Sequence, residues 1–91
     1  MPRVTSEAAG YIGQRIAELR RKYALSQDEV AARSGIDSSN IRAYENGRAM
    51  PSIHSLVRIA EALGTQPGYL IEGLTSELFV VAPHDGRRRR A

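Results

Sequence analysis

Apolar residues recur along most of the chain at the three- and four-residue spacing of an α-helix. The first such face predicts a helix over residues 8–23. Its apolar members are Ile12, Ile16, Leu19 and Tyr23. Gly10 and Gly13 are expected to weaken the start of this helix, because glycine has a low helix propensity.

Two short helices separated by a tight turn are predicted next. Ser26 and Glu29 have the spacing of a capping box, which starts a second helix, and Gly35 ends it because glycine tolerates a positive φ. Asp37 caps a third helix, which ends at residues 46–47. Two helices joined by a turn of about three to four residues containing glycine form a helix-turn-helix.

Capping signals also delimit two further helices. Ser52 caps a fourth helix that ends at Gly64, and Pro67 opens a short fifth helix that ends near Gly73. The sequence therefore predicts an all-α fold class, with five helices forming one domain over residues 8–73.

The C-terminal part of the chain departs from the helical pattern. Residues 78–81 are apolar and partly β-branched, so we expect an extended or strand-like arm over residues 74–82. This arm is a candidate dimer contact, the apolar residues 69–71 of the fifth helix are a rival one, and the arm alternatively covers the domain's own core. Residues 83–91 are expected to form a disordered basic tail, whose arginines at 87–90 either touch phosphates or only aid solubility.

Charge is distributed unevenly along the chain. The net charge is +3, with nine basic and six acidic residues over 1–58, and four acidic residues and no basic one over 59–85. A basic N-terminal part suggests a polyanionic partner, although an ordinary mixed surface would look similar.

Several classes of function are excluded by what the sequence lacks. There is no cysteine, and the two histidines stand apart from any cluster of carboxylates, so we expect no metal site and no cofactor. The sequence shows no catalytic set of a nucleophile, a general base and a residue that orients the base. We therefore expect neither an enzyme nor a small-molecule substrate. No apolar run reaches membrane-spanning length and no signal peptide pattern occurs, so we expect a cytoplasmic protein.

The outer face of the third helix carries the candidate chemistry. Ser39, Arg42, Ala43 and Asn46 lie at i, i+3, i+4 and i+7, which places them on one stripe. The stripe has a low profile, as a helix in the DNA major groove requires. The fork of Arg42 matches the two acceptors of guanine, and Ala43 suits a thymine methyl. The alternative is an ordinary exposed helix face.

Three other residues are candidate phosphate contacts. Gln27 stands at the start of the second helix, where unpaired amides attract an anion. Arg48 follows the third helix, and Arg15 lies off the apolar face of the first helix. Each of them is otherwise a solvated surface residue.

Several motifs occur in order at related separations. They are residues 25–36 (LSQDEVAARSGI), residues 41–47 (IRAYENG), Pro51-Ser52, and then Leu56, Ile59-Ala60 and Ala62-Leu63-Gly64. Together they resemble the lambda-repressor/Cro-type, XRE-like helix-turn-helix family over residues 11–73. The resemblance implies a five-helix fold whose third helix reads the major groove of double-stranded DNA, and a homodimer that binds a palindromic operator.

The resemblance also assigns roles to individual residues. It implies that Gln27 contacts a phosphate and braces the third helix, and that Asn46 contacts a phosphate. It places Ser38 with Ser39, Arg42 and Ala43 among the base-contacting positions. Family members often carry glutamine at position 38, and because serine reaches less far, we expect Arg42 to carry more of the discrimination.

The sequence thus predicts a sequence-specific transcriptional regulator, a repressor rather than an activator. The alternative is an antitoxin-like module that chiefly binds a protein partner and whose DNA binding is autoregulatory. Residues 74–91 separate the two hypotheses, since a neutralising arm would fold only with its partner.

Overall fold

The computed structural model describes residues 6–79 of the 91-residue chain. The described part contains five α-helices and one 3-10 helix, and no strand. In chain order they are α1 (Glu7–Lys22), α2 (Gln27–Ser34), α3 (Ser38–Glu45), α4 (Ile53–Leu63), α5 (Pro67–Ile71) and η1 (Ser76–Phe79). The all-α fold with five helices is therefore as the sequence predicts.

Local capping signals determine where the helices begin. The Ser26 side chain accepts from the Glu29 amide at 3.0 Å while the Glu29 carboxylate accepts from the Ser26 amide at 2.7 Å, so the capping box is present. Asp37 and Ser52 cap α3 and α4 as expected. Ser6, which the sequence analysis did not single out, caps α1 by accepting from the Ala9 amide.

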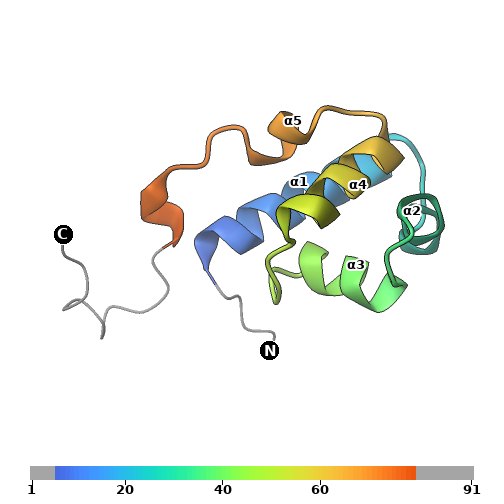
Figure 1. Cartoon of the computed structure of the whole chain (residues 1–91), viewed down its shortest axis with the longest axis horizontal. Coiled ribbons are helices and arrows are strands. Elements are labelled where there is room, and N and C mark those ends of the chain that lie inside the picture. The colour runs from blue at the N-terminus through green and yellow to red at the C-terminus, as the bar shows by residue number, and fades with distance from the viewer. Residues whose placement is uncertain (1–5, 80–91) are drawn as a thin grey trace.

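The helices surround one hydrophobic core. Helices α1 and α4 lie through the middle of the molecule, with α3 on one side and α5 on the opposite side (Figure 1). Helix α2 packs against both α3 and α4. The largest fully buried side chains come from all five helices and are Ile16, Val30, Ile41, Ile59 and Leu70. The core thus holds α2 and α3 in a fixed orientation on one side of the domain.

Gly13 allows α1 to approach the end of α3 closely. A Cβ atom at this position would lie 2.0 Å from the carbonyl oxygen of Tyr44 and 2.9 Å from that of Glu45. From the sequence alone, Gly13 is expected only to weaken the helix. The structure shows instead that the missing side chain makes room for the backbone of α3.

The C-terminal segment differs from the expected extended arm. Residues Ser76–Phe79 form the 3-10 helix η1, in which the Leu78 amide donates to the Thr75 carbonyl at 3.1 Å, and η1 packs against α1. Helical packing on α1 has overridden the strand preference of the apolar sequence. The remainder of the expected arm, residues 80–82, and the basic tail at 83–91 lie outside the described residues.

Helix α5 presents only part of its apolar sequence to the surface. Leu70 is completely buried, so it belongs to the core and not to a dimer contact. Tyr69 and Ile71 are 38% and 39% exposed. Within residues 6–79, no helix is long and apolar enough to cross a membrane, and no group of three potential metal ligands comes together.

Candidate functional site

Helix α3 turns one face to the core and the other to solvent. Ile41 is fully buried and anchors the inner face. Ser39, Arg42 and Asn46 are exposed on the outer face, and Ala43 is partly exposed beside them. The structure therefore brings these four candidates together on one exposed face of α3, as their spacing predicts.

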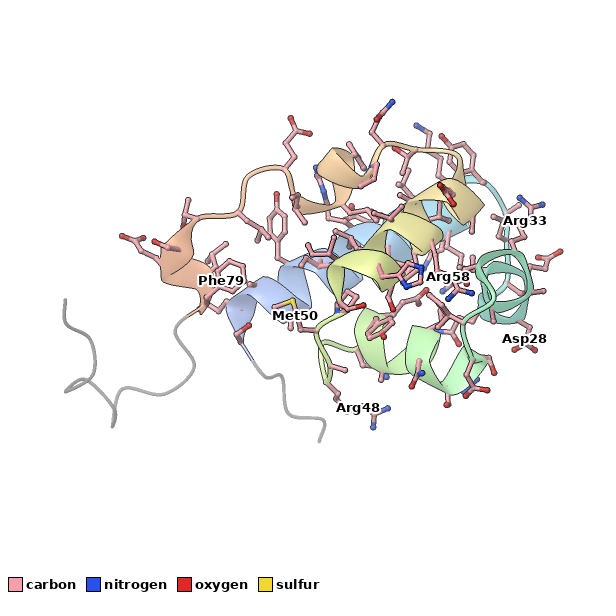
Figure 2. The ribbon with its side chains drawn as sticks, viewed as in Figure 1. Asp28, Arg33, Arg48, Met50, Arg58 and Phe79 are labelled. Carbon is pink, nitrogen blue, oxygen red and sulfur yellow. The ribbon has the colours of Figure 1, made fainter. Side chains whose placement is uncertain are left out.

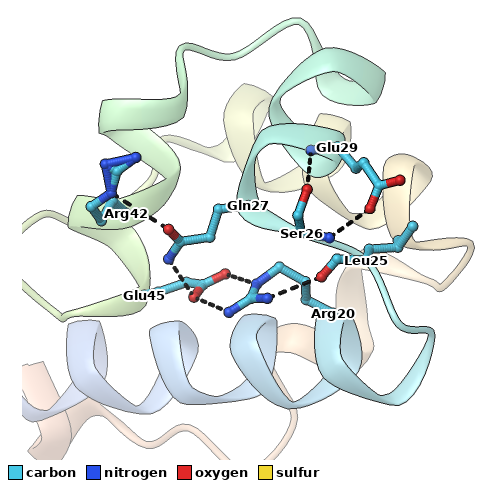
Figure 3. Close-up of polar contacts among 7 residues, drawn as sticks. All are labelled: Arg20, Leu25, Ser26, Gln27, Glu29, Arg42 and Glu45. Carbon is cyan, nitrogen blue, oxygen red and sulfur yellow. Dashed lines mark hydrogen bonds and ion pairs between the residues drawn. The ribbon is translucent and has the colours of Figure 1, made fainter.

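Helix α2 adds Gln27 to this surface. Gln27 is the first residue of α2 and is partly buried against α3. Its side-chain amide donates to Glu45 Oε1 at 2.9 Å, and its carbonyl oxygen accepts from Arg42 Nε at 3.4 Å (Figure 3). Gln27 thus links the two helices of the helix-turn-helix, and it lies where the first amides of α2 have no intrahelical acceptor.

An ion pair beneath the surface holds Glu45 in place. Arg20 of α1 donates from Nε to Glu45 Oε2 at 2.7 Å and from Nη2 to Oε1 at 3.0 Å, and its Nη1 donates to the Leu25 carbonyl at 3.0 Å. The two side chains are only 15% and 5% exposed. The hydrogen bond that Arg20 donates to Glu45 raises the pKa of Arg20 against the opposing effect of desolvation, so the guanidinium stays charged.

The serines at the start of α3 differ in their surroundings. Ser38 is the first residue of the helix and is partly exposed. The Ser39 hydroxyl donates to the Asp37 carboxylate, which also accepts from the Ser39 amide at 3.3 Å. The lone pairs of the Ser39 oxygen therefore remain for a partner that donates a hydrogen bond.

Two candidate phosphate contacts lie beyond the end of α3. Asn46 caps the C-terminus of the helix, and its own amide donates to the Arg42 carbonyl at 3.0 Å. Arg48 extends from the following loop into solvent on the same side of the molecule as α3 (Figure 2). Both residues border the exposed face of α3.

Arg15 does not join this surface. Its guanidinium lies 4.1 Å from the centre of the Tyr69 ring, donates to the Tyr69 carbonyl at 2.9 Å and contacts Glu72 at 3.4 Å. These partners are on or directly after α5, which lies across the domain from α3 (Figure 1). The side chain of Arg15 is only 22% exposed, and its contacts with Tyr69 and Glu72 link the C-terminal segment to α1.

The pairing of Arg20 with Glu45 was not predicted from the sequence, because the two residues are 25 positions apart. One signal was available. Glu45 lies four residues after Ile41 and therefore on the same helical face, which indicates that its carboxylate points toward the core and needs a cationic partner there. Only the packing of α1 on α3 shows that Arg20 is this partner.

The sequence of this chain is similar to those of known proteins. Residues 13–74 match the family described as Helix-turn-helix domain. The chain is 42% identical over 53 residues to an uncharacterized HTH-type transcriptional regulator of Sinorhizobium fredii, which covers 58% of this chain and 69% of that protein.

Two solved structures are similar in fold and sequence. The restriction-modification controller protein C.AhdI from Aeromonas hydrophila matches with a TM-score of 0.67 and 35% identity, over 68% of this chain and 94% of that one. The P22 c2 repressor, solved in complex with a synthetic operator, matches with a TM-score of 0.64 and 27% identity, over 69% of this chain and 96% of that one. The chain therefore belongs to the helix-turn-helix domain family, among DNA-binding transcriptional regulators of the lambda-repressor type and not among enzymes.

Proposed function

We propose that this protein is a sequence-specific repressor that binds a palindromic operator as a homodimer, with α3 of each protomer in the major groove. The observation that carries the proposal is the outer face of α3, where Arg42 projects from a stripe of small side chains and its Nε is held by Gln27. A low-profile helix with an oriented arginine suits the width and the acceptor pattern of the major groove.

The exposed residues of α3 take the base-reading roles. Arg42 meets the two acceptors on the major-groove edge of guanine, and Ala43 lies against a thymine methyl. Ser38 and Ser39 contact neighbouring bases. Because the Ser39 proton is directed to Asp37, this hydroxyl accepts from an amino group of adenine or cytosine.

The residues around α3 take the phosphate contacts, which position the helix without reading sequence. The amide of Gln27 keeps one hydrogen beyond the one donated to Glu45, and it lies at the N-terminus of α2 beside unpaired backbone amides. Asn46 and Arg48 contact the backbone at the other end of α3. Arg15 is left out of the interface because its donors face Tyr69 and Glu72.

The dimer follows from the size of the recognition surface. One eight-residue helix reads only a few base pairs, so a second protomer about 34 Å away along the groove supplies the second half-site. Two-fold symmetry of the protein then requires a palindromic operator. The repressor role is supported by the similarity to the P22 c2 repressor, which was solved in complex with a synthetic operator.

Selection of duplexes from a random-sequence DNA pool at near-physiological salt tests the proposal. We expect a palindromic consensus whose half-sites are centred about one helical turn apart. A single unpaired half-site would contradict the dimer. Binding that enriches no sequence and disappears as salt rises would contradict specific recognition altogether, since it would show attraction to phosphates alone.

A further inference from the structure

Four side chains from three helices form one hydrogen-bonded chain that ends on the exposed face of α3 (Figure 3). It runs from Arg20 on α1 to Glu45 at the end of α3, then to Gln27 on α2, and finally to Arg42 back on α3. The chain begins in the interior, where the Glu45 side chain is 5% exposed, passes through the partly exposed Gln27 and ends at the exposed Arg42.

Glu45 determines which way the amide of Gln27 points. An ionised carboxylate only accepts hydrogen bonds, so the group of Gln27 that faces Glu45 must be the NH₂ group. The carbonyl oxygen of Gln27 then faces Arg42 and accepts from its Nε. A flipped amide would place an oxygen against the carboxylate and two donors against each other, so both contacts would become repulsive.

Gln27 in turn sets the direction of the Arg42 fork. With Nε directed to Gln27, the two terminal nitrogens of Arg42 have no hydrogen-bond acceptor among the described residues and remain available to a base. A guanidinium whose Nε is already bonded contacts the two acceptors of guanine through its two terminal nitrogens, and not through Nε and one terminal nitrogen. An arginine that loses this contact regains rotamer freedom and must order itself on binding.

We propose that Arg20 and Glu45 are positioning residues for base reading, which act through Gln27 to aim Arg42 although neither of them touches DNA. The inference rests on the proposed function, because it requires Arg42 to read a base. It extends the determinants of sequence preference from the helix-turn-helix to α1. A purely structural ion pair would support the affinity for every sequence equally, whereas this pair supports discrimination at one base pair of each half-site.

The experiment compares variants of the full chain on the selected duplex and on duplexes changed at single base pairs, by fluorescence anisotropy. Arg42→Ala first identifies the base pair that Arg42 reads, as the position where discrimination is lost. A good arginine contact discriminates roughly 5- to 150-fold against the wrong base.

Gln27→Met keeps the length of the side chain but cannot donate or accept these hydrogen bonds. It should lower the discrimination ratio by about threefold or more at the Arg42 base pair only. Gln66→Met is the matched control, because Gln66 is exposed, caps α5 without a side-chain bond and lies across the domain from α3.

Two further variants test the interior part of the chain. Arg20→Lys keeps the charge but loses the two-pronged contact with Glu45, so we expect a smaller fall in the ratio at the same base pair. Glu45→Gln replaces the carboxylate by an amide that can turn either a donor or an acceptor toward Gln27. The orientation of Gln27 is then no longer fixed, so the ratio should fall at the Arg42 base pair.

The outcomes distinguish the inference from the function on which it rests. If the wild-type protein shows no sequence preference, the proposed function fails. If the wild type is specific but Gln27→Met and Arg20→Lys lower affinity uniformly and leave the ratio unchanged, the positioning role alone is wrong. Thermal unfolding of each variant shows whether it is folded, and the partly exposed Gln27 keeps the test decisive if a change at Glu45 prevents folding.

Discussion

The close approach of α1 to the end of α3 at Gly13 makes a strong prediction about stability. A methyl group at this position would lie 2.0 Å from the Tyr44 carbonyl oxygen, whereas ordinary contact begins at 3.4 Å. The end of α3 would therefore have to retreat by about 1.4 Å, the difference between these distances. The opposing atoms belong to the backbone, so rotation of a side chain offers no relief.

Two effects of Gly13→Ala oppose each other. Alanine favours a helix interior over glycine by about 0.8–1 kcal/mol. Overpacking costs about 1–3 kcal/mol and occasionally more, and displacement of a helix end lies at the upper end of this range. The cost of overpacking exceeds the gain in helix propensity, so we expect the free energy of unfolding to fall by about 1–2 kcal/mol.

Urea denaturation of Gly13→Ala measures this change, with Gly68→Ala as its control. Gly68 is also helical, but a Cβ atom there meets nothing within 4 Å, so this variant should be unchanged or stabilised by up to about 1 kcal/mol. A Gly13→Ala variant as stable as the wild type, or gaining stability like the control, would refute the packing argument.

Three further predictions concern single side chains. Arg42→Ala should cost about 1–3 kcal/mol of discrimination at one base pair per half-site, and unchanged ranking of duplexes would refute its role. Arg58 donates to the carbonyls of Ser34 at 2.8 Å and Gly35 at 3.1 Å at the end of α2, so Arg58→Ala should lower the free energy of unfolding by about 1–2 kcal/mol, measured in urea, with base preference kept. Ser26→Ala removes the cap of α2 and should cost about 1 kcal/mol in the same assay, whereas no loss would mean that the capping box contributes nothing.

Helix boundaries were predictable because their signals are local. Ser26, Asp37 and Ser52 cap helices by bonds to amides two or three residues away, and Gly35 and Gly64 end helices with φ of +73°. Such interactions are contained in a few consecutive residues. A sequence therefore shows them directly, without knowledge of the tertiary structure.

The roles that depend on packing were not predictable in the same way. The importance of Gly13 lies in its approach to α3, and the position of Arg15 depends on α5, which is 54 residues away at Tyr69. Leu78 and Phe79 belong to the strand-like stretch at residues 78–81, but they lie in the 3-10 helix η1, which packs against α1. In each case a contact between distant segments decides what the local sequence leaves open.

The sequence predicts which residues of the candidate site are exposed together, but not the hydrogen bonds that hold them from beneath. The spacing of Ser39, Arg42 and Ala43 was enough to place them on one exposed stripe. The hydrogen bonds that hold Arg42 come from Gln27, which belongs to another helix, and they depend on the buried position of Glu45. Periodicity identifies a face, whereas the contacts beneath it require the fold.

The central claim is that the outer face of α3 and the start of α2 contact DNA, and mapping of backbone amide chemical shifts by NMR tests it most directly. The full chain is titrated with the selected duplex and with an unrelated duplex of equal length. We expect the largest shifts specific to the selected duplex at Gln27 and over residues 38–48, with small changes in α5. Specific shifts concentrated in α5 and η1, with α3 unaffected, would contradict the account.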